Sequence, residues 1–216
     1  MLALTDININ YEGRTILDHA CLSVARGEIV SLVGPSGSGK TSLLRVIAGL
    51  EQPSHGTVVI DNKLMTGIPT HKRDVGLVFQ DNQLFPHLSV FDNVAYSLRI
   101  KRVSKALQNE KVNEVLSLVG MQDLAHRDVG HLSGGEAKRI AVARALVADP
   151  FILLLDEPLT GLDTELHDRL LEDMGVLLRT RGTTVVHFTH DHNEATRLSN
   201  RVVDVRTLGQ PYSQLQ

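Results

Sequence analysis

The sequence GPSGSGKT at residues 34–41 limits the possible folds more than any other feature of the chain. It has the pattern G-x-x-x-x-G-K-[ST], and it lies between an apolar run at 28–33 and a helical apolar spacing over 41–50. Its glycines let the backbone curl, so that successive N–H groups point inward at the start of a helix. A strand, a tight loop and a helix in this order predict an α/β domain that binds a nucleoside triphosphate.

Two side chains at the end of this loop suit a triphosphate and its metal ion. Lys40 would reach the β- and γ-phosphates, and the hydroxyl of Thr41 would ligate Mg²⁺. The candidate nucleotide-binding residues of this segment are Gly34, Pro35, Ser36, Gly37, Ser38, Gly39, Lys40, Thr41 and Ser42.

A second candidate site follows the apolar run in FILLLDEP, residues 151–158. A buried strand that ends in Asp156 would bring this carboxylate to the ligand-binding edge of the sheet, where it could hold the water shell of Mg²⁺. If Glu157 faces the same crevice, it is a candidate to orient and deprotonate an attacking water. A solvated acidic turn before Pro158 is the alternative explanation, and the phosphate loop makes it the weaker one.

The sequence LSGGE, residues 132–136, combines a helix start with two glycines. Ser133 and Glu136 have the S-x-x-E spacing of a capping box. A capping box does not require Gly134 and Gly135, and glycine weakens a helix by about 1 kcal/mol relative to alanine. Without Cβ atoms, the first turn would let an anion approach the exposed N–H groups, which predicts a second phosphate site. Glu136 would repel a triphosphate unless it turns back to cap the helix, and we expect it to turn back.

The order of elements predicts one α/β domain with an insertion. Strand-like runs over the first 33 residues indicate an antiparallel edge sheet at the N-terminus. Helical spacing over 83–148 predicts an inserted helical subdomain between two core segments, 1–82 and 149–216. Strands and helices alternate again after the insertion, so we expect a mostly parallel sheet covered on both faces and a single domain over 1–216.

Composition and charge argue against several classes of protein. A formal net charge of −3 and a pI near 6.4 provide no basic surface for a nucleic acid. Cys21 is the only cysteine, and the first residues lack the pattern of a secretory signal, so the expected location is cytoplasmic. No apolar run approaches the roughly 18 residues that cross a bilayer, so any membrane role would need a partner protein.

With these motifs the sequence resembles the ATP-binding subunit of an ABC transporter, in which LSGG is the family signature and lies between the two Walker motifs. The resemblance covers essentially the whole chain. It implies ATP and Mg²⁺ as cofactors. It also implies a homodimer arranged head to tail through ATP, in which the signature of one copy completes the nucleotide site of the other.

The resemblance assigns roles to further residues. Tyr11 matches the aromatic residue that stacks on adenine, although packing at a sheet edge would also explain it. Gln80 matches the glutamine that senses Mg²⁺ and the attacking water, and Asp163 matches the aspartate that communicates across the dimer. His190 matches the switch histidine that contacts the γ-phosphate. The implied catalytic residues are Lys40, Gln80, Glu157 and His190, and the implied metal residues are Thr41, Gln80 and Asp156.

Two other features of the sequence bear on these assignments. The run HFTHDH also suggests a metal site, but His187 and His190 on a continuing strand would point to opposite faces and could not share one ion. Gly161 stands where the family usually has alanine, and we expect this glycine to loosen the segment that bears Asp163.

Residues 81–94 indicate the kind of transporter. They resemble the segment that docks a coupling helix of the membrane subunit in importers of sulfate, polyamines, ferric iron and thiamine. Leu84, Phe85 and Pro86 would form either an apolar landing surface or core beneath a loop. The resemblance implies permease subunits in the membrane, a solute-binding protein, no nucleic acid, and a peripheral location on the inner face of the cell membrane. Many such importers have an added C-terminal β-domain, and we expect no regulation through such a domain in this chain.

A soluble ATPase in DNA repair or chromosome maintenance is the alternative function, because LSGGE also resembles the heads of those proteins. Those heads carry a very long coiled coil between the phosphate loop and the signature. The corresponding segment of this chain is short and has no sustained heptads. The sequence therefore favours ATP hydrolysis that drives transport of a small solute, with import as the expected direction.

Overall fold

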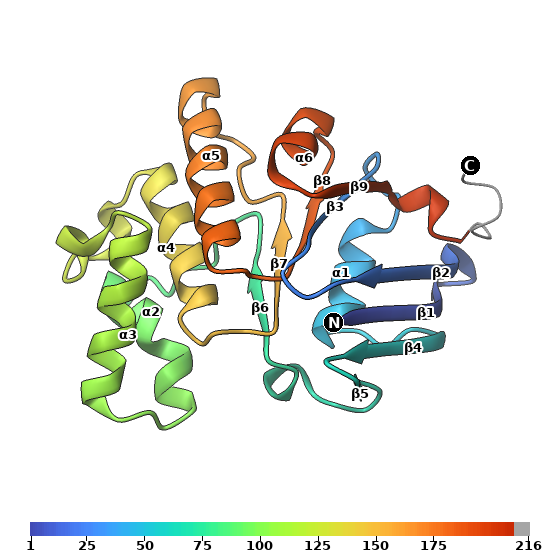
Figure 1. Ribbon diagram of the computed structural model, residues 1–216, viewed down its shortest axis with the longest axis horizontal. Coiled ribbons are helices and arrows are strands. Elements are labelled where there is room, and N and C mark those ends of the chain that lie inside the picture. The colour runs from blue at the N-terminus through green and yellow to red at the C-terminus, as the bar shows by residue number, and fades with distance from the viewer. Residues whose placement is uncertain (210–216) are drawn as a thin grey trace.

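The computed structural model describes residues 1–209 (Figure 1). The strands are β1 (Leu2–Tyr11), β2 (Arg14–Val24), β3 (Ile29–Val33), β4 (His55–Ile60), β5 (Lys63–Leu64), β6 (Val75–Val78), β7 (Ile152–Asp156), β8 (Val185–Thr189) and β9 (Arg201–Asp204). The helices are α1 (Lys40–Ala48), α2 (Val90–Ile100), α3 (Lys105–Leu118), α4 (Gly134–Leu146), α5 (Thr164–Thr180) and α6 (His192–Leu198). Short 3₁₀ turns are η1 (Thr70–Lys72), η2 (Gln122–Leu124), η3 (Val129–His131) and η4 (Val205–Thr207).

The strands form two sheets, as the sequence predicted. The antiparallel sheet has the order β2-β1-β4-β5, and the parallel sheet has the order β6-β7-β8-β3-β9. In the parallel sheet Val33 is paired with Thr189, and Asp156 is paired with Phe188. The phosphate loop, the acidic residues Asp156 and Glu157, and the turn that carries His190 therefore all lie at the same edge of the sheet. Ligands bind at this edge in open α/β folds.

The inner strands β3, β7 and β8 of the parallel sheet are buried on both faces, because they are apolar at most positions. In β7, Leu153 and Leu155 join a core with α2 to α5, whereas Ile152 and Leu154 join a core with α1 and the antiparallel sheet. Figure 1 shows the same division, with α1 and the antiparallel sheet to one side of β6 and β7 and the helices α2 to α4 to the other. The alternation of side chains along a strand makes one sheet serve two cores.

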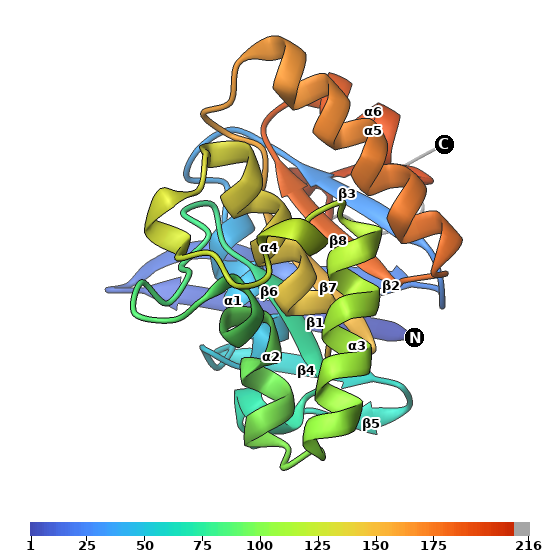
Figure 2. The same cartoon turned by 90° about the vertical axis from the view of Figure 1, so that its left-hand side faces the viewer.

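Helices α2, α3 and α4 pack together in the segment predicted to be helical (Figure 2). Ser89 caps α2 by accepting a hydrogen bond from the backbone N–H of Asp92, and Ser104 caps α3 in the same way. Their buried residues belong to the core that also includes Leu153 and Leu155, so these helices share a core with the sheet. Within residues 1–209, no helix combines the length and the apolar character needed to cross a bilayer.

Candidate nucleotide site

The loop between β3 and α1 is exposed at residues 35–37 and leads into a helix that has no side-chain cap. Gly37 and Gly39 have φ values of +78° and +93°, in the left-handed region that favours glycine. Gly39 is the N-cap of α1 and provides no side-chain cap, so no side chain occupies the first N–H groups of this helix. The hollow beside the loop is lined by Ile16, Ser36, Gly37, Gly39, Lys40, Thr41, Ser42 and Glu157.

Lys40 lies folded over this loop. Its side chain is buried, and Nζ donates hydrogen bonds to the carbonyl oxygens of Gly34 at 2.6 Å and Pro35 at 3.1 Å. The hydroxyl of Ser38 is also buried and has no hydrogen-bond partner within the part of the chain that the structure describes. The fixed ammonium of Lys40 and the unpaired hydroxyl of Ser38 both lie at a glycine-containing loop before a helix. Such a loop suits a phosphate ligand.

The carboxylate of Asp156 lies at the end of β7, close enough to Lys40 to feel its charge. Burial raises the pKa of the Asp156 carboxyl, the negative charge of Glu157 raises it further, and Lys40 and Arg45 oppose both effects. The hydroxyl of Thr41 lines the hollow from the first turn of α1. Carboxylate and hydroxyl oxygens are the ligands that Mg²⁺ prefers, so this donor set fits the ion.

We expect Asp156→Asn to raise the thermal stability of the ligand-free protein at neutral pH, because the folded state penalises the charge of this carboxylate. A raised pKa in the folded state costs stability as the pH rises through the unfolded value, which is 3.8. Thermal melts should therefore place the variant above the wild type at pH 7, with the difference closing toward about pH 4. Equal melting temperatures at both pH values would contradict the argument.

Glu157 and His190 contact each other across the edge of the sheet. His190 Nδ1 lies 3.1 Å from Glu157 Oε1, and the hydroxyl of Thr160 donates to Oε2 at 3.3 Å. The backbone N–H of Glu157 donates to the carbonyl of Phe188 at 2.9 Å, and its φ of +45° departs from the strand conformation. The structure thus brings together two residues that the sequence separates by more than thirty positions.

Gln80 and Tyr11, which were also predicted to belong to the site, are not among the described residues that line this hollow. Gln80 is exposed in the turn that follows β6, the strand next to β7. The hydroxyl of Tyr11 donates to the carboxylate of Glu51, and Tyr11 does not line the hollow, whereas Ile16 does. Ile16 was not predicted from the sequence, and only its place just after the β1–β2 turn could have suggested it.

Asp163 is the N-cap of α5, where its carboxylate accepts a hydrogen bond from the backbone N–H of Leu166 at 3.0 Å. Gly161, two residues earlier, has a φ of +82°. Glycine is the residue best suited to this conformation, and alanine would be strained there. The expectation that Gly161 loosens the segment therefore finds no support in its backbone conformation.

The capping box predicted at LSGGE is formed. The carboxylate of Glu136 accepts from the backbone N–H of Ser133 at 2.7 Å, and the hydroxyl of Ser133 accepts from the backbone N–H of Glu136 at 3.3 Å. The backbone hydrogen bond from Ser133 is the main cause that lowers the pKa of Glu136, and Arg127 contributes from 4.0 Å. The side chain of Glu136 has turned back as expected.

The two glycines of this motif have different surroundings. A Cβ at Gly134 would meet only Leu162, at 3.8 Å, so the surface beside this residue is open. A Cβ at Gly135 would lie 2.9 Å from the side chain of Leu166, so this buried glycine lets α4 pack closely on α5. The interpretation that both glycines make room for an anion is therefore corrected for Gly135, whose contact is internal packing.

The α4 tip lies apart from the phosphate loop. In Figure 1, α4 and α1 occupy opposite sides of β6 and β7. Among the described residues that line the hollow at the phosphate loop, none comes from 133–136. Within one copy of the chain, the α4 tip and the phosphate loop are therefore two separate surfaces.

Phe85, in the segment at residues 84–86, lines a groove between α2 and the parallel sheet. Leu84 packs against the core, whereas the ring of Phe85 contacts that of Tyr96 in a tilted arrangement with centroids 4.5 Å apart and lies beneath the guanidinium of Arg144. Ile100 and Tyr96 line the same groove and are exposed. The two alternatives for this segment thus apply to different residues: Leu84 is partly buried against the core, Phe85 lines a surface groove, and Pro86 is exposed.

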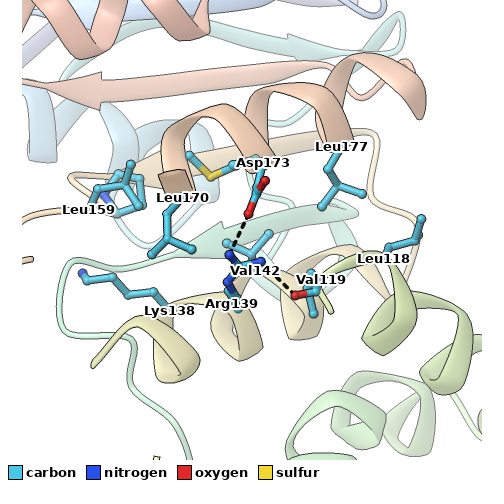
Figure 3. Close-up of a pocket in the computed structure, with 11 residues that line it drawn as sticks. Leu118, Val119, Lys138, Arg139, Val142, Leu159, Leu170, Asp173 and Leu177 are labelled. Atoms are coloured by element: carbon cyan, nitrogen blue, oxygen red, sulfur yellow. Dashed lines mark hydrogen bonds and ion pairs between the residues drawn. The ribbon is translucent and has the colours of Figure 1, made fainter. Parts of the chain in front are cut away.

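A separate cavity of about 40 Å³ lies between α4 and α5 (Figure 3). Its lining is mostly apolar, and Arg139 crosses it with hydrogen bonds to Asp173 and to the carbonyl of Val119. This volume holds a few water molecules at most. The cavity is a packing gap and not a second nucleotide site.

Residues 17–160 match the profile of the family described as ABC transporter. An Fe(3+) ions import ATP-binding protein of Streptomyces coelicolor is 47% identical over 206 residues, which cover 95% of this chain and 59% of that protein. A spermidine/putrescine import ATP-binding protein of Thermotoga maritima is 41% identical over 216 residues, which cover 98% and 59%. A dimeric ATP-binding cassette solved in a post-hydrolysis state with ADP and Pi has a TM-score of 0.83 at 32% identity, covering 94% of both chains. The chain thus spans about three fifths of the length of these curated relatives.

Proposed function

Because this chain belongs to the ABC transporter family as an ATP-binding domain, we propose that it hydrolyses ATP to drive the transport of a small solute. The observation that carries the proposal is the contact between Glu157 and His190 beside the hollow of the phosphate loop. A base, a cradle for phosphate and a polar group at the position of the γ-phosphate are the parts that phosphoryl transfer to water requires.

The residues of the site divide the chemistry between them. The backbone of 34–41 and Lys40 would hold the β- and γ-phosphates, and Glu157 would accept a proton from the attacking water. His190 would donate a hydrogen bond toward the γ-phosphate, and Gln80 would orient the water. Mg²⁺, held by Thr41 and Asp156 together with Gln80, would neutralise charge that develops on the phosphates.

Two copies would close head to tail, so that Ser133, Gly134 and Glu136 of one cover the ATP of the other. Support for this step comes from the separation of the α4 tip from the phosphate loop within one chain (Figure 1). The structure of similar fold described as a dimer bound to ADP and Pi also supports it. Tyr11 would stack on adenine after leaving Glu51, and Asp163 would lie near the partner copy.

Mixing two inactive variants tests the shared site. Lys40→Ala removes the cation from the phosphate loop, and Ser133→Arg fills the α4 tip, so each variant alone should hydrolyse ATP poorly. A mixed dimer has one site that carries both substitutions and one that carries neither, so the mixture should recover up to about a quarter of wild-type turnover if dimers form at random. A mixture no more active than its components would argue against the shared site.

The membrane partner would dock in the groove beside Phe85, Tyr96 and Ile100. This groove combines exposed apolar side chains with Arg144, which suits an amphipathic helix. The relatives named for iron and polyamine import favour a permease of the import class. We propose a peripheral location at the inner face of the membrane and a solute-binding protein outside it. No observation favours the alternative role in DNA repair, and we propose no nucleic-acid partner.

A further inference from the structure

A buried polar cluster links β3, β8 and α6 behind the predicted switch histidine. His187 Nδ1 lies 2.9 Å from the hydroxyl of Ser31, and His187 Nε2 lies 3.2 Å from Glu194 Oε1. The hydroxyl of Thr189 donates to Glu194 Oε2 at 2.8 Å. These side chains are at most 6% exposed, and both oxygens of the carboxylate have partners. None of them was assigned a role from the sequence.

The cluster keeps Glu194 ionised. Burial alone would raise the pKa of the Glu194 carboxyl, but hydrogen bonds from His187 and Thr189 and the charge of nearby imidazoles lower it below its usual value. His167 Nε2 on α5 lies 4.0 Å away, and the buried ammonium of Lys138 on α4 is attracted to the same carboxylate. Cationic or donor groups from three elements thus converge on one acid, which is how a buried charge is tolerated.

The cluster ends at the backbone on both sides of His190. The hydroxyl of Thr189 accepts a hydrogen bond from the backbone N–H of Asp191 at 3.1 Å, so the residues before and after His190 are tied together. Asp191 in turn caps α6 by accepting from the backbone N–H of Glu194 at 3.2 Å. The imidazole of His190 is 57% exposed, and within residues 1–209 its polar contact is with Glu157. The position of this ring therefore depends on the turn that carries it.

We propose that Glu194 is a positioning residue, which fixes the turn at His190 through the hydroxyl of Thr189 and so holds the imidazole against Glu157. This inference rests on the proposed function, because the ring it positions is the one assigned to the γ-phosphate. Glu194 is buried and is not among the described residues that line the hollow at the phosphate loop. A displacement of about 1 Å at a reacting group can cost on the order of a hundredfold in rate, so loss of this support should lower kcat more than substrate affinity.

The hydroxyl of Thr189 gives the cleanest test, because valine has nearly the same shape without the donor. We expect Thr189→Val to lower kcat for ATP hydrolysis by about tenfold with KM for ATP within about threefold of wild type. Thr189→Ser keeps the hydroxyl and should restore most of the lost rate. Glu194→Gln should fall between them, since an amide oxygen can accept from Thr189 while its nitrogen faces His187. Glu172→Gln, an exposed carboxyl on α5, is the matched control and should leave kcat unchanged.

A readout without turnover separates this inference from the proposed function. In the full chain with labelled histidine, the NMR signals of the His190 ring should shift or broaden in Thr189→Val and return in Thr189→Ser. If the wild type does not hydrolyse ATP but the His190 ring signals still shift in Thr189→Val, the proposed function is contradicted and the positioning role stands. Unchanged ring signals and a kcat within twofold of wild type in folded Thr189→Val would overturn the positioning role itself.

Discussion

Replacing Glu157 with glutamine is expected to lower kcat for ATP hydrolysis by about 10²- to 10⁴-fold while ATP binding persists. Glutamine has the same shape but cannot take a proton from water at neutral pH. Its amide oxygen can take the place of Oε2 and accept from Thr160, while its nitrogen takes the place of Oε1 beside His190 Nδ1, so the shape of the site should be kept. The measurement is single-turnover hydrolysis beside equilibrium binding of ATP, because the first reports chemistry and the second reports the cradle.

Two comparisons make the Glu157 result specific. Lys40→Ala should lose both binding and hydrolysis, since it removes the cation that the phosphate loop holds at Gly34 and Pro35. Glu172→Gln removes an exposed carboxyl from α5 and should leave both quantities near the wild type. If Glu157→Gln turned over ATP within tenfold of the wild type, Glu157 would not be the base, and the positive φ at this residue would need another explanation.

The features that could be predicted from sequence are those set by local patterns. The strand, loop and helix around 34–41 follow from glycine spacing and apolar periodicity, and the capping box at Ser133 follows from an S-x-x-E spacing. The parallel sheet follows from strands that alternate with helices. The first two patterns lie within about ten residues of chain, and the third is the order of elements along the chain, so none of them requires knowledge of distant contacts.

The features that could not be predicted depend on contacts between distant segments. Glu194 has the sequence context of an exposed acid in the first turn of a helix, and only the approach of β8 to α6 makes it a buried carboxylate. Gly135 belongs to a motif that suggests anion binding, but its tight contact is with Leu166 on α5. Local periodicity carries no signal for either contact.

Arg73 is a further residue whose context misleads, and it leads to the largest expected effect on stability. The sequence THKRD has the composition of an exposed turn, yet Arg73 is 3% exposed. Its guanidinium donates to the carbonyls of Val46 and Ile47 in the last turn of α1, and also to those of Met65 and Ile68. Burial lowers the pKa of Arg73, so the protein has placed a costly charge at this position.

The cost is offset by what the guanidinium satisfies. The last carbonyls of a helix have no partner within the helix, and a cation at this end also interacts favourably with the helix dipole. Gly49 leaves the space for it, since a Cβ there would lie 2.3 Å from Arg73 Nε. One side chain thus joins the end of α1, the helix that begins at the phosphate loop, to the segment between β5 and β6.

We therefore expect Arg73→Ala to lower the free energy of unfolding by about 3–5 kcal/mol, because it leaves several buried carbonyls without donors. Arg73→Lys should lose somewhat less, because its ammonium can still donate to some of these carbonyls. It should not match the wild type, because an ammonium lacks the planar fork that reaches carbonyls on separate segments. Arg26→Ala is the control: this arginine forms an exposed pair with Asp61, and its loss should cost under about 1 kcal/mol. Urea denaturation measures all three. If Arg73→Ala lowered the free energy of unfolding no more than Arg26→Ala does, water would have to replace the guanidinium at the end of α1. The helix that begins at the phosphate loop would then not depend on Arg73.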